Sequence, residues 1–478
     1  MLRTVDVGRT TSIPEEQARY QAAMRKYQRE KGPPLHIEGL QPFILKPDAS
    51  RAFGRHARRE NILAARVVGE LVRSSLGPKG MKKMLVNNDG LIWVTSDGAT
   101  LLSKMDFQHP VAKLMVEVAQ AVHREVGDGA TSTVLLASEL LKRSDDMVQQ
   151  GLHPTVISEG YIKAGKEALR ICRKIATSVN PTDTSVLRNV ASTALCGRMN
   201  DKNIAHSSTV ATDAALSAMH RVRTKYDLDL SDVNVEKKVG GSLAEVRLVD
   251  GFAFCRELAH PAMPRTTQDA KVAVLQGQLK LDKRGRTPYE HVFTIQHVDD
   301  AKRLTDGRLR VLQEMVGRLV NVGANVVVLE KGIDATVADI LARHGVMAIR
   351  RVVIEDLERI AKATGARVVS HVEDLSADDL GSAKTVAVRK VGGDDWTFIE
   401  GCVNPKCVTI LIRGATERLT DEAERSLIGA VATLRSIMQR PLIVAGGGAV
   451  EIELAAQLRR WGERIAGRRQ LPILNFAE

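Results

Sequence analysis

Residues 325–372 read NVVVLEKGIDATVADILARHGVMAIRRVVIEDLERIAKATGARVVSHV. Short β-branched runs alternate in this stretch with segments whose apolar residues recur at helical spacing. The runs NVVVLEKG, VMAIRRV and ARVVSHV predict strands, while IDATVADILARHG and EDLERIAKATG predict helices. Strands that alternate with helices are typical of an α/β domain. The same style extends over residues 250–405, which we interpret as one α/β module.

The segments on both sides of this module are mostly helical in pattern. Apolar residues at helical spacing predict helices over the ranges 61–76, 131–150, 154–179, 420–438 and 449–461. A further helix opens at Pro110, with one apolar stripe made of Val111, Leu114, Met115, Val118 and Val122. The run KMLVNNDGLIWVT at 83–95 predicts a hairpin with Asp89-Gly90 in its turn. Polar or Gly-rich connectors at Gly240-Gly241 and Gly392-Gly393-Asp394-Asp395 suit module boundaries.

Composition excludes several classes of protein. The chain of 478 residues is 44% hydrophobic and only 3% aromatic, so a large core can form but base stacking on exposed rings is disfavoured. The net charge of +12 comes from dispersed Lys and Arg, which favours a charged surface over a nucleic-acid site. Five widely spaced cysteines fit buried, reduced thiols. Without a signal peptide or an apolar run of membrane-spanning length, we expect a cytoplasmic protein with no membrane partner.

Three Gly-rich loops could bind phosphate groups. They are Leu76-Gly-Pro-Lys-Gly80, Gly127-Asp-Gly-Ala-Thr-Ser132 and Gly446-Gly-Gly448. Glycine lets backbone N–H groups approach an anion closely, and a helix N-terminus adds partial positive charge. Thr131 and Ser132 would add hydroxyls, and Asp128 offers a hard oxygen ligand for Mg²⁺. No P-loop pattern is present.

A fourth element, Ser96-Asp97-Gly98-Ala99-Thr100, follows the predicted hairpin. Asp97 either caps the next helix or positions a water molecule beside a phosphate. Each loop alone fits a turn or a helix cap, because Gly and Asp are the usual turn residues. Four such elements beside helix starts favour a nucleotide site.

These residues carry a resemblance to a known family. The runs at 59–90, TSDGATLL and EVGDGATSTVLLASELL resemble the ATP-binding half of a group II chaperonin, the thermosome type of folding ring. The resemblance continues through LHPTVISEGYIKA, HPAMPR, ANVVVLEKGID, IAKATGARVV, KVGGDDWTFIEGC and VAGGGAVEIELA, and covers residues 40–478. It implies a multidomain α and α/β fold: a helical equatorial domain, a small intermediate domain, and an inserted α/β apical domain with a helical protrusion.

The resemblance also implies domain boundaries. Residues 1–38 would be an N-terminal extension, 39–180 and 442–478 the equatorial domain, 181–250 and 406–441 the intermediate domain, and 251–405 the apical domain. Residues 295–316 would form the protrusion that closes the chamber. The helix with Val337, Ile340 and Leu341 would either present apolar residues to unfolded proteins or pack against its neighbouring strand.

The implied site binds ATP and Mg²⁺. Asp128 would bind the metal, and Asp97 would be one of two carboxylates that orient the attacking water. The nucleotide would lie against Leu76, Gly77, Pro78, Gly127, Gly129, Thr131, Ser132, Arg198 and Gly447. Arg198 stands where the family has a Lys that senses the terminal phosphate, and it keeps the charge but not the geometry.

The chain departs from the family pattern in places that bear on catalysis. The second catalytic Asp position reads Gly429, and neither Asp421 nor Glu422 can replace it, because each lies at least two helical turns away. Ala130 replaces a phosphate-binding Thr. The family also continues beyond Glu478 with more equatorial helices and a terminal strand, so the chain is expected to be C-terminally short.

Three functions follow as hypotheses. The first is an ATP-dependent chaperone subunit that encloses unfolded proteins in a homo- or hetero-oligomeric ring, with hydrolysis left open by Gly429. The second is a non-hydrolysing relative that acts as a holdase or scaffold. The third is a basic nucleic-acid-binding protein, motivated only by the net charge of +12 and testable by salt-sensitive retention of DNA or RNA.

Overall fold

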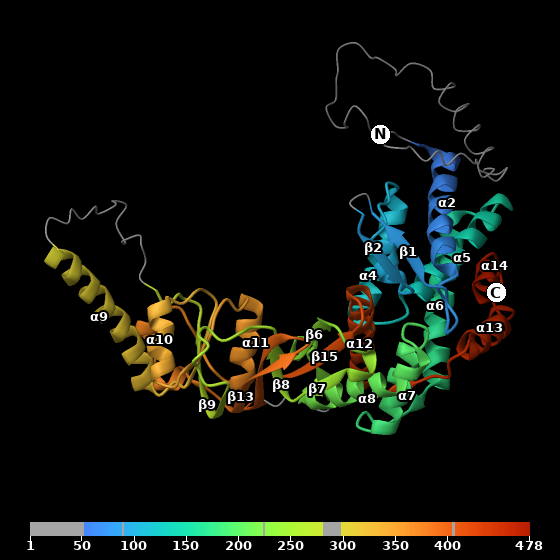
Figure 1. Cartoon of the computed structure of the whole chain (residues 1–478). Helices are drawn as coiled ribbons and strands as arrows, with labels where there is room; N and C mark the ends of the chain where they lie inside the picture. The colour runs from blue at the N-terminus through green and yellow to red at the C-terminus, as the bar shows by residue number, and fades with distance from the viewer. Residues whose placement is uncertain (1–51, 88–89, 223–224, 281–297, 404–406) are drawn as a thin grey trace, which may run out of the picture. The chain divides into compact units, whose positions relative to one another are not determined.

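The computed structural model describes residues 52–87, 90–222, 225–280, 298–403 and 407–478 (Figure 1). The chain divides into two compact units, Met1–Ala57 and Arg58–Glu478, and nearly all described residues belong to the second. The proposed N-terminal extension at 1–38 lies outside the described residues. Among the described helices, none is long and apolar enough to cross a membrane.

Helices from both ends of the sequence pack together. They are α2 (Gly54–Arg73), α3 (Gly98–Ser103), α4 (Pro110–Val126), α5 (Ala130–Gln149), α6 (Pro154–Ile175), α13 (Ala449–Gly462) and α14 (Gln470–Ala477). Both α4 and α6 begin with Pro at the first position, where its missing N–H leaves no hydrogen bond unmade. Helices α13 and α14 pack on α6, and Gly160 of α6 leaves room for Pro472 (Figure 1). This return supports the prediction that the α/β module is inserted between helical segments.

The predicted hairpin is present. Strand β1 (Lys83–Val86) pairs antiparallel with β2 (Ile92–Thr95), although the turn residues 88–89 lie outside the described part. Next to it, Ala65, Val68 and Val72 of α2 pack with α3, α4 and α5 into one buried cluster. The loops predicted to bind phosphate begin where these elements end.

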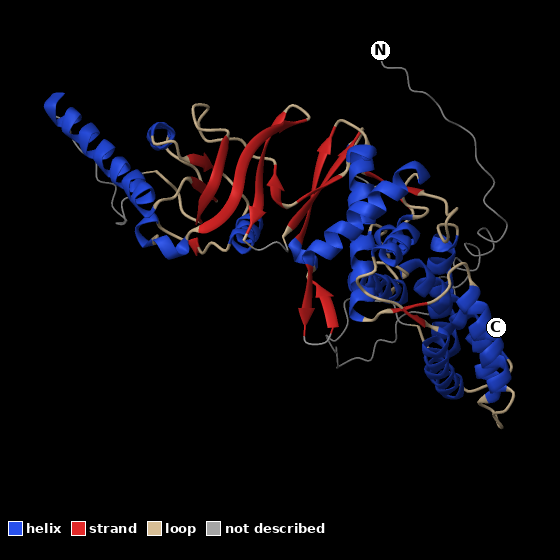
Figure 2. Ribbon diagram, turned by 90° about the horizontal axis from the view of Figure 1, so that it is seen from below, coloured by secondary structure: helices blue, strands red, loops and turns tan. Residues whose placement is uncertain are grey.

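The predicted α/β module contains a seven-stranded sheet, whose strands are among the red arrows in Figure 2. Its order is β11-β10-β9-β13-β14-β8, with β12 also on β9. The strands are β8 (Gly251–Phe254), β9 (Thr266–Leu275), β10 (Val326–Leu329), β11 (Met347–Ile349), β12 (Val368–Val369), β13 (Gly381–Val391) and β14 (Asp394–Cys402). Strands β10, β11 and β12 run parallel within the sheet, as the strand–helix alternation predicts, and β13 and β14 run antiparallel.

Three helices cover the two faces of this sheet. They are α9 (Val298–Val322), α10 (Ala335–Arg343) and α11 (Ile354–Thr364). Leu312 and Leu341 of α9 and α10 pack on one face, and Ile360 of α11 packs on the other. Alternate residues of β10 divide between the two clusters because successive side chains of a strand point to opposite faces.

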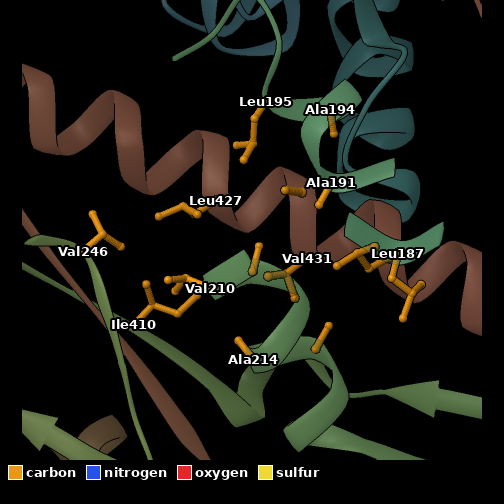
Figure 3. Close-up of a cluster of buried hydrophobic side chains, with 14 of the residues drawn as sticks. Leu187, Ala191, Ala194, Leu195, Val210, Ala214, Val246, Ile410, Leu427 and Val431 are labelled. Carbon is orange, nitrogen blue, oxygen red and sulfur yellow. The ribbon is translucent and has the colours of Figure 1, made fainter. Parts of the chain in front are cut away.

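A smaller sheet and three helices form the largest apolar core (Figure 3). Strand β15 (Val408–Gly414) lies between β6 (Val233–Val239) and β7 (Arg247–Val249). Leu187 of α7 (Thr184–Leu195), Val210 of α8 (Asp201–Ala218) and Leu427 of α12 (Glu417–Gln439) pack against this sheet. The remaining elements are β3 (Thr177–Ser178), β4 (Met219–Val222), β5 (Lys225–Leu228), β16 (Leu442–Ile443), η1 (Leu230–Asp232), η2 (Leu243–Glu245), η3 (Val372–Asp374) and η4 (Ala377–Asp379).

The structure confirms the mixed α and α/β fold but corrects the predicted connectors. Gly392-Gly393 forms the turn of the β13–β14 hairpin, and Gly240-Gly241 follows β6 within the small sheet, so neither is a module boundary. The polar and glycine-rich composition marked tight turns instead. The prediction that the chain returns to helices after residue 405 also missed strand β15. The domain boundaries remain a prediction.

For α10 the structure supports the second of the two alternatives. Val337 and Leu341 are fully buried against the sheet, and Ile340 is half-buried against the same cluster. The predicted protrusion at 295–316 begins in residues outside the described part, and its remainder belongs to α9. All five cysteines are free, yet Cys196 is exposed, contrary to the expectation of buried thiols.

Candidate functional site

A cavity of about 530 Å³ lies where the Gly-rich loops meet. Its walls come from the loop after α2, the start of α5, the end of α7 with the following turn, and the loop before α13. The predicted residues that line it are Leu76, Gly77, Pro78, Asp128, Gly129, Thr131, Ser132, Arg198 and Gly447. Segments as far apart in the sequence as Leu76 and Gly447 thus meet at one place, as the four-loop argument predicted.

Two helix N-termini adjoin this cavity without side-chain caps. Gly129 is the N-cap of α5 and Gly448 the N-cap of α13, both in the left-handed conformation, with φ of 83° and 84°. The first N–H groups of a helix have no partner within the helix, and here no cap side chain accepts from them. Such N–H groups and the helix dipole favour a bound anion.

Glycines bring the walls into close contact. A Cβ at Gly98 would lie 2.4 Å from Thr131 Oγ1, so only glycine lets the start of α3 approach the start of α5. A Cβ at Gly197, where φ is +78°, would lie 3.1 Å from the carbonyl oxygens of Gly77 and Pro78. The turn after α7 therefore rests directly on the first Gly-rich loop.

Asp97 is buried next to Ser96, which lines the cavity, but Asp97 itself does not line it. Its Oδ2 accepts hydrogen bonds from Thr100 N at 2.9 Å and Thr100 Oγ1 at 2.8 Å, so it caps α3 as one of the two interpretations predicted. Burial raises the pKa of the Asp97 carboxyl, but the charge of Arg198, the Thr100 N–H and His123 outweigh burial and hold this pKa below its usual range. The carboxylate is therefore buried and ionised.

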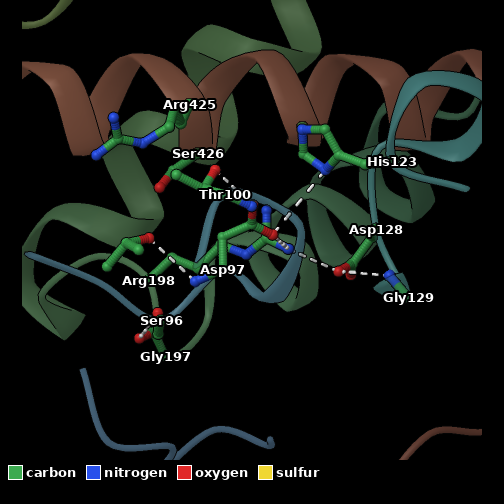
Figure 4. A network of polar contacts seen from close by, with 12 residues as sticks. Ser96, Asp97, Thr100, His123, Asp128, Gly129, Gly197, Arg198, Arg425 and Ser426 are labelled. Atoms are coloured by element: carbon green, nitrogen blue, oxygen red, sulfur yellow. Dashed lines mark hydrogen bonds and ion pairs between the residues drawn. The ribbon is translucent and has the colours of Figure 1, made fainter. Parts of the chain in front are cut away.

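Arg198 connects the two carboxylates of the site (Figure 4). Its Nη2 donates to Asp128 Oδ1 at 2.8 Å and lies 3.4 Å from Asp97 Oδ1. Asp128 Oδ1 also accepts from Gly129 N at 2.8 Å. The Asp128 side chain is 45% exposed, against 6% for Asp97, so only Asp128 is open to a ligand in the cavity. His123 Nδ1 lies 3.9 Å from Asp97 Oδ1.

Helix α12 packs beside Arg198 through Gly429. A Cβ at Gly429 would lie 3.0 Å from Arg198 Nη1 and 3.0 Å from the Gly127 carbonyl oxygen. Position 429 therefore faces the guanidinium, close to where the resemblance implies a carboxylate. Nearby, Asp421 Oδ1 accepts from Lys237 Nζ at 2.6 Å, and buried Glu422 accepts from Thr95 at 3.3 Å. Asp421 is thus bound to Lys237, and Glu422 is held by Thr95 and Arg425, so that neither carboxylate contacts Arg198.

Gly127 is predicted to contact the nucleotide, but its observed contacts are of another kind. It ends α4 with φ of +83°, and a Cβ there would lie 2.5 Å from Ala432 Cβ of α12. Its observed contact is the packing of α4 on α12, and it does not line the cavity. Contact with nucleotide remains a prediction for this residue.

Sequence reasoning missed the wall formed by the end of α7. Ser192, Thr193 and Cys196 line the cavity, together with Ser75 and Gly197. Small polar residues at a helix end look like ordinary helix surface in a sequence. The signal that could have found them is Arg198, because its predicted contact with phosphate places the preceding turn at the same site.

The cavity suits a nucleotide with a divalent cation. Its volume is within the range of small-molecule sites, and the uncapped helix starts suit phosphates. Among the described residues, no group of three or more His, Cys, Asp or Glu could hold a metal by itself. Asp128 alone fits Mg²⁺, which is often held by one or two carboxylates together with phosphate oxygens.

Comparison with known proteins places the chain among relatives. Residues 68–478 match the model of the TCP-1/cpn60 chaperonin family. The chain is 42% identical to thermosome subunit alpha of Archaeoglobus fulgidus over 441 residues, which is 92% of this chain and 80% of that subunit. It is 45% identical to thermosome subunit alpha of Aeropyrum pernix over 446 residues, 92% of this chain and 79% of that one. For thermosome subunit beta of Thermococcus kodakarensis the identity is 42%, over 92% and 80% of the two chains.

Proposed function

The chain belongs to the TCP-1/cpn60 chaperonin family as a subunit of the group II type, and from this we propose that it binds ATP in the cavity beside Arg198 and uses the nucleotide to drive the enclosure of unfolded proteins. One observation supports the proposal most strongly. Two glycine-capped helix starts, at Ala130 and Ala449, adjoin one cavity that also contains an arginine and an accessible carboxylate. This combination suits a polyphosphate with its cation.

Each residue of the cavity has a proposed task. Thr131, Ser132 and the N–H groups of the first turn of α5 would bind phosphate oxygens, and Gly77, Pro78 and Gly447 would lie against the nucleotide. Asp128 would hold Mg²⁺, which would screen the phosphate charge. Arg198 would contact the terminal phosphate, and buried Asp97 would hold Arg198 in place and orient water.

Hydrolysis is proposed to be slow. A water-orienting base contributes on the order of 10²–10⁴ to a rate, and position 429 has no side chain to supply one. Asp97 keeps one carboxylate near the cavity, but its Oδ2 is already occupied by the α3 cap. Binding of ATP, more than its turnover, would then drive the conformational change.

We further propose a ring of identical or mixed subunits that takes unfolded proteins as clients. Arg198 follows α7, whose core includes α8, α12 and the small sheet. A nucleotide that contacts Arg198 would therefore act on that core as well as on the loops of α3 and α5. Such a contact between two packed bodies is the usual basis of domain closure.

The first experiment measures the native molar mass of the purified chain by light scattering, with and without Mg-ATP. A discrete assembly of many subunits supports the ring. A monomer or a polydisperse aggregate in both conditions would refute ring formation by this chain alone. Isothermal titration with Mg-ATP in the same buffer measures binding independently of assembly.

Gly429 separates the two chaperonin hypotheses. We predict that Gly429→Asp raises ATP turnover at least about tenfold, because it restores a carboxylate beside Arg198. Gly429→Asn is the matched control, since it has the same shape without the charge and should not raise turnover. Equal rates in wild type and both variants would show that other parts of the hydrolytic site have failed.

Equal turnover in wild type and both variants would favour the alternative function, a non-hydrolysing chaperonin that acts as a holdase or scaffold. Gly429 and the ion pair between Arg198 and Asp128 are the observations that favour this alternative. Binding of ATP without turnover, with unchanged binding of a reduced and unfolded model protein, would support it.

A further inference from the structure

Arg198 and Gly429 form one structural unit. The guanidinium Nη1 lies where a side chain at 429 would begin, only 3.0 Å from the position of its Cβ. A Cβ there would also lie 3.0 Å from the Gly127 carbonyl oxygen, a tight contact in which the neighbouring atoms must shift by a few tenths of an ångström. Glycine at 429 therefore provides the room in which Arg198 lies.

In this position, the positive charge of Arg198 lies where a bound cation would neutralise two carboxylates. Two carboxylates meet here, and the Nη2 of Arg198 contacts Oδ1 of both. The side chain of Arg198 is only 14% exposed, so solvent screens its contact with buried Asp97 weakly, and its contact with the 45% exposed Asp128 more strongly. The Oδ1 of Asp128 has its second contact with Gly129 N and is fully engaged.

A guanidinium suits this task better than an ammonium. Its charge is permanent, its fork is rigid, and it is more weakly hydrated, so it remains between carboxylates in a partly buried place. The contact with Asp97 fixes the guanidinium from the buried side, where Asp97 is itself held by Thr100. Arg198 is thus positioned before any ligand enters.

We propose that Arg198 is a tethered cation that competes with Mg²⁺ for Asp128, and that the nucleotide consequently binds this chain with little dependence on a divalent cation. The inference rests on the proposed nucleotide site and adds its cation requirement. A divalent cation must displace the guanidinium from Asp128 Oδ1 or share the carboxylate with it, whereas the phosphates meet a positive charge that is already present.

The test measures the affinity for the non-hydrolysable ATP analogue AMP-PNP by titration calorimetry, once in excess MgCl₂ and once in EDTA. For wild type, the two dissociation constants should agree within about threefold. In Arg198→Gln, the affinity in EDTA should be at least about tenfold weaker than in MgCl₂, because the Asp128 carboxylate then faces the phosphates without the guanidinium, and the buried charge of Asp97 is also left without it. Arg389→Gln is the matched control: it removes an arginine from an ion pair with Glu400 on the sheet and should behave like wild type.

A second measurement needs no nucleotide. Mn²⁺ binding to the free protein, followed by electron paramagnetic resonance, should be at least about tenfold tighter in Arg198→Gln than in wild type, and Asp128→Asn should abolish the gain. If Arg198→Gln does not fold, Arg198→Lys makes the same comparison with a smaller effect expected, because its single ammonium is more strongly hydrated.

The outcomes are distinguishable. A wild-type affinity for AMP-PNP that falls tenfold or more in EDTA, together with unchanged Mn²⁺ binding in the variants, would overturn the tethered-cation inference and leave the nucleotide site intact. Absence of AMP-PNP binding to wild type in both buffers would overturn the proposed site and the inference with it.

Discussion

Gly127 and Gly129 have the same backbone conformation in different surroundings. Both have φ of +83°, a value that side chains other than glycine rarely adopt. A Cβ at Gly127 would lie 2.5 Å from Ala432 Cβ and 2.6 Å from the Gly429 carbonyl oxygen, whereas a Cβ at Gly129 would meet nothing within 4 Å. The pair therefore separates the cost of the backbone conformation from the cost of the contact between α4 and α12.

The expected magnitudes follow from that difference. Alanine in the left-handed conformation costs about 1–2 kcal/mol, and both variants bear this cost. Gly127→Ala adds overpacking against a neighbouring backbone, which costs about 1–3 kcal/mol more. We therefore predict that Gly127→Ala destabilises the contact between α4 and α12 by about 2–5 kcal/mol, and Gly129→Ala destabilises its own loop by about 1–2 kcal/mol.

Hydrogen exchange of the nucleotide-free protein provides a local assay, because a protein of this size need not unfold in one step. Amides of α12 near Gly429 and Thr433 should exchange about 5- to 150-fold faster in Gly127→Ala than in Gly129→Ala, which corresponds to the difference of about 1–3 kcal/mol. Equal exchange in the two variants would refute the claim that glycine is required by the α4–α12 contact.

Two further predictions concern parts of the chain away from the cavity. Trp396→Ala should lower stability by about 3–5 kcal/mol, because Trp396 is fully buried with Phe398 and Leu411 between the two sheets. Urea unfolding followed by circular dichroism measures this against Trp93→Ala, a half-buried tryptophan that should cost less. Burial, and next the charge of Asp356, raise the pKa of Glu236 from 4.5 to about 7. Between these two pH values the folded state therefore binds more protons than the unfolded state. The free energy of unfolding should fall as pH rises through this window, by up to about 3 kcal/mol. Glu236→Gln should remove that slope; an unchanged slope in the midpoint of unfolding against pH would contradict the assignment.

The fold was predictable where local pattern and burial agree. Strands such as β10 are buried on both faces, so they appear as continuous β-branched runs; the run at 325–332 predicts β10 with a start one residue early and an end three residues late. The stripe on α4 was only partly right: Met115 is buried, but Leu114 and Val118 are exposed by 58% and 45%, while Ala112 and Ala119 are buried. Small residues allow neighbouring helices to approach α4 closely, and a pattern weighted by large apolar residues does not register that contact.

The candidate site was predictable in its loops but not in its contacts. Glycine next to Asp or hydroxyl residues marks a helix start that can receive an anion, which is a local property of the sequence. The approach of Arg198 to Asp97 joins residues 101 positions apart, and the close fit of Gly429 to Arg198 depends on how α12 crosses α4. Such distances are set by the packing of the whole core and leave no local signal.

The position of Arg198 explains how occupancy of the cavity could reach the rest of the chain. Arg198 follows α7, within the core formed by α7, α8, α12 and the small sheet, whereas Asp97 and Asp128 belong to the loops of α3 and α5. The pair Arg198–Asp128 is therefore a bond between two packed cores, which are also joined by the packing of α12 on α4 and by polar contacts such as Lys82 Nζ to the Arg198 carbonyl oxygen. A phosphate that draws Arg198 towards itself replaces the Arg198–Asp128 bond with a bond between Arg198 and the ligand, at the same contact between the two cores. Because a ligand shifts an equilibrium only by its differential affinity for two states, the strength of the Arg198–Asp128 bond sets how far nucleotide binding can shift the arrangement of the two cores.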